Sequence, residues 1–318
     1  MRSFIPVFTV ILLAAGGAMA SAAESADIEG RYLGEPEPGM EARPFAPGML
    51  ASRPDNYIRT ITFSPGGDEA YWPVIDTTDE YRRWIVHSRM KGGVWTEPAK
   101  AWFSEREYFD DVPCISPGGD MLVFLSGRPV VEGGKIDKER IWYMRRTGDG
   151  WSVPVALPGH INEAYSVHQQ VSLDSGNGLY FGGEGPGGYG SLDICLSGYK
   201  DGEYLAPVNL GPVINTSEGE YAPCVSPDGS CLIFTRNIGD GWTLMISFRD
   251  GDRRWTPPVD LREHLDGFES SNLSGACITP DSKRLIFFSE KGDEGNAPYV
   301  ISTTFIEELR AESTSPSH

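Results

Sequence analysis

One short pattern recurs five times along this chain: a strand, a tight turn and a second apolar strand. It is clearest at positions 221–237, which read YAPCVSPDGSCLIFTRN. Pro227 presets the backbone of the turn, Asp228 can bond to its own backbone, and Gly229 can adopt a positive φ without a Cβ clash. The flanking apolar and β-branched residues indicate a β-hairpin, which is marginally stable alone and therefore needs neighbours.

The five copies are spaced almost evenly. The other four read ITFSPGGDEAYW, PCISPGGDMLVFLS, QQVSLDSGNGLYFGGE and ACITPDSKRLIFFSE. Their turns follow one another at intervals of 52, 56, 54 and 53 residues, measured between Pro65, Pro117, Leu173, Pro227 and Pro280. A regular interval of this length is the signature of a repeat fold.

Each interval holds two further strand signals. One is an apolar run after the hairpin, predicted over 84–88, 141–145, 192–196, 244–248 and 298–303. The other is an aromatic residue followed by Pro and an apolar residue, as in Trp151-Ser152-Val153-Pro154-Val155. Because Pro is tolerated on an edge strand but not in a central one, this motif predicts the outermost strand of each unit. Repeated four-stranded units are typical of the blades of a β-propeller.

The fifth unit lacks an outermost strand. The segment Arg43-Pro44-Phe45-Ala46-Pro47-Gly48 resembles the edge motif and precedes the first hairpin. We expect it to pair with the strand at 298–303, which would close the ring and remove two exposed sheet edges. The predicted fold is therefore all-β, a β-propeller of five four-stranded blades closed by an N-terminal strand. A sixth blade remains open, since it would need further strands within residues 27–48.

Other segments flank this ring. Residues 1–20 combine Arg2, an apolar run at 4–15 and the triplet Ala18-Met19-Ala20, a pattern typical of a cleaved secretory signal peptide. The apolar run is shorter than the ~20 residues of a membrane span. We expect an extended segment over 21–42, the propeller domain over 43–306 and a tail over 307–318. The protein is predicted to be periplasmic or secreted, monomeric, and without a membrane span once the signal is removed.

Charge and cysteine content limit the partners. The formal net charge is −18, which disfavours nucleic acid and acidic membrane surfaces. Cys114, Cys224 and Cys277 share one position in three repeats, which favours packing over disulfide formation. The five histidines show no close metal-ligand spacing, and the sequence contains no G-x-S-x-G elbow. We therefore predict no disulfide framework, metal site, cofactor or catalytic serine.

The turns SPDGSCLIF, SPGGDMLVF and TPDSKRLIF resemble the repeats of TolB-type, WD-repeat-like β-propellers of exported bacterial proteins. The resemblance covers residues 43–304. It implies a periplasmic or secreted propeller that often serves as a scaffold for protein interactions, and it says little else about function. Leu173 in place of Pro, and Gly66 and Gly118 in place of Asp, depart from the repeat at the turn.

A propeller places the loops that lead into its inner strands, and those that leave their partner strands, on one face around the channel mouth. Loops are where binding residues concentrate. The candidate ligand-binding residues on the loops that lead into the inner strands are Asp110, Asp111, Tyr165, His168, Gln169, Glu220 and Tyr221. Those on the loops that leave the partner strands are Arg128, Glu184, Arg236 and Glu290.

Three functions are compatible with this pattern. The favoured one is an exported non-enzymatic propeller that binds a protein or a cell-envelope or glycan ligand at the mouth. The second is a carbohydrate-active hydrolase, lyase or lectin that uses carboxylates such as Asp111 and Glu220. The third is a structural domain whose partners dock on its rim. A mouth plugged by Gln169, Gln170 and tyrosines would favour a scaffold, and an open mouth with converging carboxylates would favour an enzyme.

Overall fold

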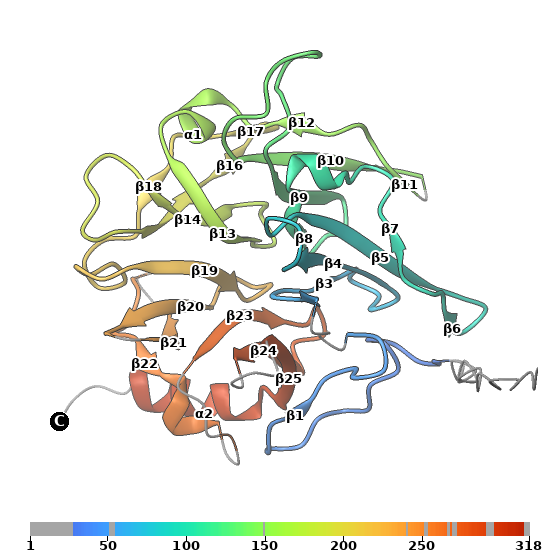
Figure 1. Cartoon of the computed structure of the whole chain (residues 1–318). Helices are drawn as coiled ribbons and strands as arrows, with labels where there is room; N and C mark the ends of the chain where they lie inside the picture. Colours follow the sequence, from blue (N-terminus) through green and yellow to red (C-terminus); the bar gives the residue numbers. More distant parts are fainter. Residues whose placement is uncertain are drawn as a thin grey trace, which may run out of the picture.

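The computed structural model describes residues 28–50, 55–148, 150–239, 241–250, 254–265, 268, 272–290 and 296–314. Antiparallel sheets form five blades around a central channel (Figure 1), so the predicted β-propeller is confirmed. Between residues 28 and 48 the only named strand is β1 (Arg43–Pro44), so this segment holds no sixth blade. The signal-like residues 1–20 lie outside the described residues.

The first three blades follow the chain order. Blade one contains β2 (Asn56–Tyr57), β3 (Thr62–Phe63), β4 (Glu69–Asp76), β5 (Arg83–Lys91), β6 (Val94–Trp95) and β7 (Ala99–Lys100). Blade two contains β8 (Asp111–Ile115), β9 (Met121–Ser126), β10 (Arg140–Thr147), β11 (Gly150–Trp151) and β12 (Val155–Ala156). Blade three contains β13 (Ser166–Leu173), β14 (Leu179–Glu184), β15 (Asp193–Ser197) and β18 (Val208–Asn209), with the ribbon β16 (Tyr199–Lys200) and β17 (Glu203–Tyr204) at its edge.

The last two blades complete the ring. Blade four contains β19 (Glu220–Val225), β20 (Cys231–Ile238), β21 (Gly241–Phe248) and β22 (Val259–Asp260). Blade five contains β23 (Leu273–Ile278), β24 (Arg284–Glu290), β25 (Asn296–Ser302) and β1. Short helices η1 (Arg106–Tyr108), α1 (Gly159–Asn162) and η2 (Leu261–His264) lie between blades, and α2 (Thr304–Thr314) follows the last strand. No helix in the described ranges is long and apolar enough to cross a bilayer.

The predicted closure of the ring is also confirmed. Arg43 lies opposite Val300 and Pro44 opposite Tyr299 in an antiparallel pair, and the amide of Phe45 donates to the carbonyl of Pro298 at 2.9 Å. The Phe45 side chain is fully buried in a cluster formed with blade one and blade five. Two segments far apart in sequence therefore share one sheet, which leaves no open edge at this junction.

The outermost strands differ in one detail from the prediction. In blades one and two the aromatic-Pro motif forms two short pieces rather than one strand, because Pro has no N–H to donate to the ladder. In blade one, β6 pairs with the end of β5 and β7 pairs with its middle, with Pro98 between the two. In blade two, β11 and β12 pair with β10 in the same way.

The Ser-Pro turns are fixed by a recurring side-chain contact. The hydroxyls of Ser64, Ser116 and Ser226 each accept a hydrogen bond at 3.0 Å from the amide five residues later. Ser226 Oγ donates to Asp228 at 2.6 Å, whereas Ser64 Oγ donates to Asp68 at 2.7 Å. Asp68 therefore takes over the role of the aspartate that is missing at position 66.

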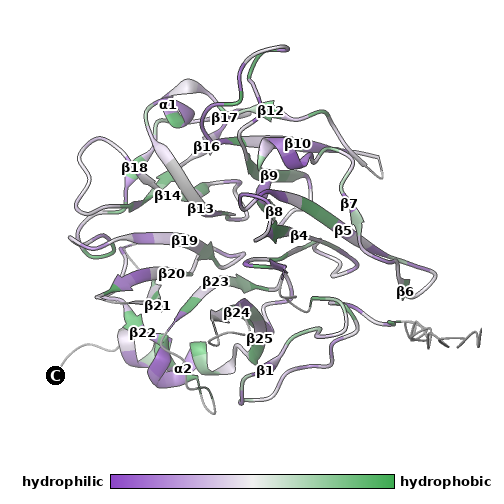
Figure 2. Ribbon diagram, viewed as in Figure 1, coloured by the Kyte–Doolittle hydropathy of each residue, from purple (hydrophilic) through white to green (hydrophobic). Residues whose placement is uncertain are grey.

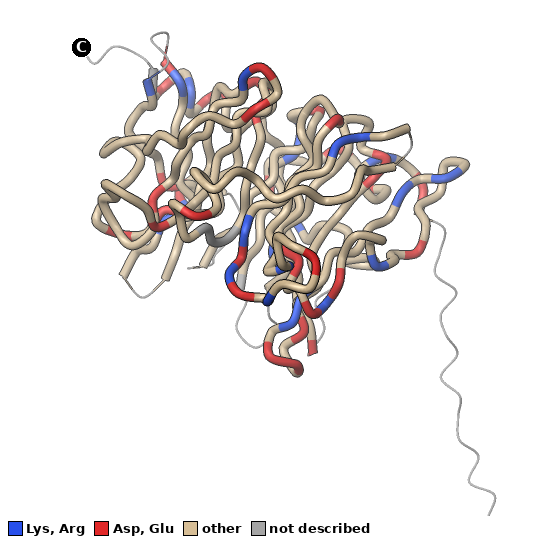
Figure 3. Tube along the Cα trace, turned by 90° about the horizontal axis from the view of Figure 1, so that it is seen from above, with Lys and Arg blue, Asp and Glu red and all other residues tan. Residues whose placement is uncertain are grey.

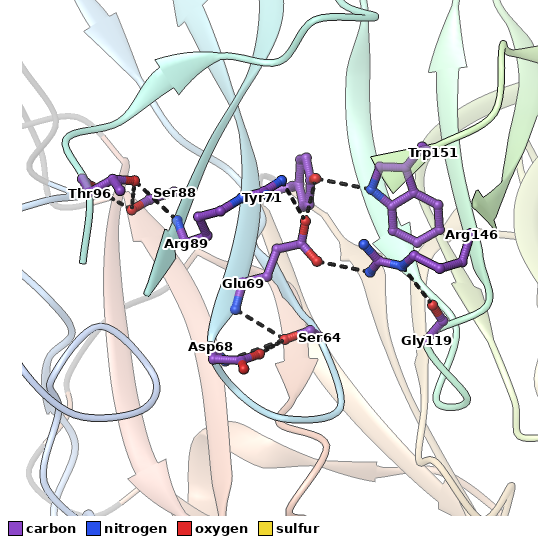
Figure 4. A network of polar contacts seen from close by, with 10 residues as sticks. All are labelled: Ser64, Asp68, Glu69, Tyr71, Ser88, Arg89, Thr96, Gly119, Arg146 and Trp151. Atoms are coloured by element: carbon purple, nitrogen blue, oxygen red, sulfur yellow. Dashed lines mark hydrogen bonds and ion pairs between the residues drawn. The ribbon is translucent and has the colours of Figure 1, made fainter. Parts of the chain in front are cut away.

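A polar cluster joins blade one to blade two (Figure 4). Tyr71 donates to Glu69 at 2.7 Å and accepts a hydrogen bond from the indole N–H of Trp151 at 3.0 Å. Arg146 binds the other oxygen of Glu69 at 2.8 Å, and its guanidinium lies 3.7 Å from the ring centre of Trp151. Burial and the adjacent Glu69 carboxylate raise the pKa of Tyr71, which keeps the phenol protonated as a donor.

The hydrophobic core lies between the blades. Figure 2 shows green, hydrophobic stretches in strands such as β5, β8 and β23, and both colours on α2. Helix α2 buries Phe305, Ile306 and Leu309 in the cluster formed by blades four and five. The helix therefore spans position 306, the predicted end of the propeller domain, and packs against the blades on both sides of that position.

Candidate functional site

The mouth face is the end of the propeller that carries the connections between blades and between the second and third strands. In blades one and two, three of these connections contact one another: 77–82, 101–110 and 127–139, here called the mouth loops. Arg106 on the second loop binds Asp76 at 2.7 Å and Asp79 at 3.2 Å. The amide of Gly127 donates to the carbonyl of Tyr108 at 2.7 Å. These contacts hold the three loops as one surface.

Asp110 and Arg128, both candidate residues, form a buried pair beneath this surface. The Asp110 carboxylate is fully buried and receives Arg128 Nη2 at 2.8 Å and the amide of Glu105 at 2.8 Å. Arg128 also donates to the carbonyl of Phe103 at 2.8 Å. Burial raises the pKa of Asp110 although Arg128 opposes the shift. The pair ties the loop before β8 to the loop after β9.

Glu220 and Arg236 repeat this arrangement in blade four. Arg236 Nε lies 2.8 Å from Glu220 Oε1, and the Glu220 carboxylate is fully buried. Thr216 also donates to this carboxylate: its amide donates to Glu220 Oε2 at 2.9 Å, and its hydroxyl donates to Glu220 Oε1 at 2.6 Å. Arg236 also donates to the carbonyl of Ile214 at 2.8 Å. Both pairs brace a blade junction, and neither carboxylate can reach a ligand.

Asp111 is buried between two arginines from blade one. Its carboxylate pairs with Arg83 at 2.6 Å and with Arg59, and Arg83 also pairs with Glu139 on the third mouth loop. Sequence reasoning did not single out either arginine. Arg59 stands three residues before Thr62, as Asp111 stands three before Cys114, so aligning the repeats could have found it. The arrangement neutralises Asp111, which then has neither the exposure nor the free oxygens that an acid–base catalyst needs.

A bulge in the inner strands of blades two and four sets the direction of these side chains. The strand register shifts between Asp111 and Cys114 in blade two and between Tyr221 and Cys224 in blade four. Val112 and Ala222 lie in these bulges with φ of 44° and 50°. A positive φ is strained for a β-branched residue such as Val, and bulges of this kind commonly re-aim a side chain.

The remaining candidates are spread around the mouth. Tyr165 is half-buried against Phe181, with ring centres 5.4 Å apart, and Tyr221 is half-buried where Gly182 allows a close approach of blade three. Glu184 is exposed at the end of β14. His168 and Gln169 belong to β13 and Glu290 ends β24, but their side chains lie outside the described part of the structure.

Gln170 plugs the channel below the mouth. Its side-chain amide donates to the carbonyl of Ala276 at 2.7 Å, which joins blade three to blade five. The channel cavity is only about 60 Å³, far below the roughly 300 Å³ of a small ligand site. Its lining includes inner-strand residues from every blade, among them Thr62, Cys114, Ser172, Cys224 and Cys277. Among the described residues, the channel at this level is therefore too small for such a ligand.

The repeat position shared by Cys114, Cys224 and Cys277 takes part in hydrogen bonds between neighbouring blades. Thr62 Oγ1 accepts from the amide of Ile115 at 3.0 Å, and Ser172 Oγ accepts from the amide of Val225 at 3.0 Å. Cys224 Sγ occupies the same place and accepts from the amide of Ile278 at 3.3 Å. Burial raises the pKa of Cys224 to about 12, so the thiol stays protonated. All five cysteines are free thiols.

Exposed apolar and aromatic side chains gather on the mouth loops. Tyr81 on the first loop is 58% exposed and Trp102 on the second is 59% exposed. On the third loop, Val131 is 68% exposed, and Val130 and Ile136 are also exposed. Sequence reasoning missed this group because it considered only the loop residues next to the inner strands and their partner strands. The signal was available in GRPVVEGGKIDKE at 127–139, where two adjacent valines stand in a long polar connection.

The distribution of acidic and basic residues does not indicate a further binding site. Figure 3 shows acidic and basic segments interspersed along the trace. Within the described residues, no group of three or more His, Cys, Asp or Glu side chains is placed to hold a metal ion.

Comparison with known proteins yields likenesses of structure only. No protein-family model matches the chain, and no curated protein matches it. The solved structure of TolB from Acinetobacter baumannii is 12% identical, with a TM-score of 0.47 over 78% of this chain and 55% of that one. A protein described as TolB from Agrobacterium tumefaciens is 15% identical, with a TM-score of 0.47 over 74% of this chain and 70% of that one.

An enzyme is about equally similar. The α-L-arabinofuranosidase from Podospora anserina is 12% identical, with a TM-score of 0.45 over 79% of this chain and 91% of that one. At such identities the likeness concerns the fold and carries no information about activity. The class that the fold defines is the five-bladed β-propeller, and the expected TolB relationship has no support beyond that level.

Proposed function

We propose that this chain is a non-enzymatic binding protein that docks a protein partner on the mouth loops of blades one and two. The observation that carries the proposal is the group of exposed side chains on these loops, with Tyr81, Trp102 and Val131 more than half exposed. Aromatic residues are enriched in protein interfaces, and exposed apolar patches commonly mark them. An exported location remains part of the proposal, on the basis of the signal-like N-terminal sequence.

The loops are held in place from below, which favours binding. Arg106 joins the first and second loops, Arg128 joins the second and third through Asp110, and Arg83 reaches Glu139 on the third. A surface that is already ordered loses little conformational entropy when a partner binds. The same ion pairs that remove carboxylates from chemistry thus provide a rigid base for docking.

Catalysis at the mouth is less well supported. A glycosidase needs two carboxyl groups that face the substrate with separate roles. Asp110, Asp111 and Glu220 are instead fully buried and paired with arginines. The hydrogen bond from Gln170 to Ala276 across the channel further supports a scaffold over an enzyme.

A pair of matched variants tests the proposal. Val131→Asp places a charge on the third mouth loop, whereas Val153→Asp places the same charge on the outer edge of blade two, where Val153 is 71% exposed. A photoreactive group at position 136 should crosslink a specific protein in the native envelope fraction. Val131→Asp should weaken binding of that protein at least tenfold, and Val153→Asp should leave it unchanged. Equal binding by the two variants would contradict the proposal.

A further inference from the structure

A cavity lies on the turn face, the end of the propeller opposite the mouth. It has a volume of about 470 Å³, within the range of small-molecule sites. Its walls are the Ser-Pro turn of blade four, the turn of blade five, the first residues of α2, and Glu37 and Pro38 of the N-terminal segment. Figure 1 shows α2 beside β22 and β25 at this part of the ring.

Hydroxyl groups dominate the polar part of this cavity. They belong to Ser226, Ser230, Ser282, Ser302, Thr303 and Thr304. A hydroxyl can donate one hydrogen bond and accept two, so a wall of hydroxyls suits a ligand whose own groups do both. Pro38, Ile278 and Ile306 supply an apolar part of the wall. A saccharide has this combination of hydroxyls and C–H faces.

The charged residues of the cavity are already bound within the protein. Arg310 Nη2 donates to the hydroxyl of Ser230 at 2.8 Å, and Lys283 pairs with Glu37. Asp228 accepts from Ser226 at 2.6 Å and from the amide of Ser230 at 3.0 Å. The lining has three carboxylates and two cations, so an anionic ligand would meet a net negative charge.

We propose that this cavity, here called the turn-face pocket, binds a neutral saccharide. The site is separate from the mouth loops in position and in ligand class, so it goes beyond the proposed docking function. Ser226 Oγ is already used within the turn, and the Thr303 hydroxyl donates to the carbonyl of Ser282. Hydrogen bonds with the other four hydroxyls would select the ligand, and the apolar wall would contact one face of the sugar ring.

Two tryptophan variants on α2 test the site. Glu307 is exposed and lines the pocket, whereas Glu308 is exposed on the same helix and does not line it. Glu307→Trp should therefore fill the pocket, and Glu308→Trp is the matched control. Binding is measured on the full chain by ligand-observed NMR with glucose, N-acetylglucosamine and maltose, and with glucose 6-phosphate as the anionic probe. Thr304→Val removes one hydroxyl of the wall with little change of shape.

The proposal predicts that at least one neutral sugar binds at millimolar concentration or below and more tightly than glucose 6-phosphate. Glu307→Trp should weaken that binding at least tenfold, Thr304→Val several-fold, and Glu308→Trp not at all. It is overturned if none of the neutral sugars binds, if glucose 6-phosphate binds more tightly, or if both tryptophan variants behave alike. Val131→Asp on the mouth should leave sugar binding unchanged, which separates this test from that of the docking function.

Discussion

Arg236 Nε lies 2.8 Å from Glu220 Oε1, and that carboxylate has no exposed surface. Removal of the guanidinium would leave a buried charge without its partner, which typically costs about 3–5 kcal/mol. We expect Arg236→Ala to lower the free energy of unfolding by about that amount, as measured by urea denaturation. Glu184→Ala, at an exposed mouth position, should change it by less than about 0.5 kcal/mol. Similar values for both variants would mean that the pair does not brace the junction.

The hydroxyl of Tyr71 links two blades, since it contacts both Glu69 and Trp151. Tyr71→Phe would leave the buried indole N–H without this acceptor, a loss of about 1–3 kcal/mol. Thermal unfolding followed by tryptophan fluorescence should show a lower midpoint. Tyr81→Phe removes a hydroxyl from an exposed ring and serves as the control. An unchanged midpoint in Tyr71→Phe would contradict a stabilising role for this contact.

Ring closure depends on the fully buried Phe45 beside β1. Phe45→Ala should lower the free energy of unfolding by about 3–5 kcal/mol through lost burial and a cavity. Loss of the β1–β25 pairing should also increase hydrogen exchange in β25. Met40→Ala, at an exposed position of the same segment, should have little effect. Unchanged exchange in β25 in both variants would show that closure does not rely on this side chain.

The buried thiols predict a loss of stability at alkaline pH. Burial raises the pKa of Cys224 to about 12 and that of Cys231 to about 11, from an ordinary value of 9.0. Above pH 9 the unfolded chain ionises first, so stability is full below pH 9 and falls as the pH rises. Each such thiol should contribute about 1.4 kcal/mol per pH unit to this fall.

The variant Cys224→Ser isolates one of these thiols. It keeps an acceptor for the amide of Ile278 and removes the ionisable thiol. Its unfolding free energy, measured by urea denaturation between pH 8 and pH 11, should therefore decline less steeply than that of the wild type. Parallel curves for the two proteins would refute the assignment.

Much of the blade architecture follows from local sequence. The Ser-Pro turns, the positive φ of Gly229 and the Pro residues of the edge motifs act within a few residues, so their effects can be predicted without the fold. The segment that closes the ring could also be predicted, because Arg43–Gly48 has the edge pattern that the fifth unit lacks. The split of the edge strand at Pro in blades one and two follows from the same missing N–H, although the prediction drew it as one strand.

The partners of the candidate residues could not be predicted in this way. Asp111 looked like an accessible acid on a loop, but Arg59 and Arg83 from the preceding blade surround it. Likewise, the turn-face pocket joins Glu37 to Arg310, which are separated by most of the chain. Such contacts depend on how neighbouring blades pack.

The repeat by itself determined five sheets, their order and the segment that closes them, because turn chemistry and strand pattern are local properties of the chain. Only the tertiary structure decided which carboxylates are buried and which side chains remain exposed on the mouth loops. The physical reason is that burial and ion pairing depend on distances between blades, and the sequence of one blade does not contain those distances.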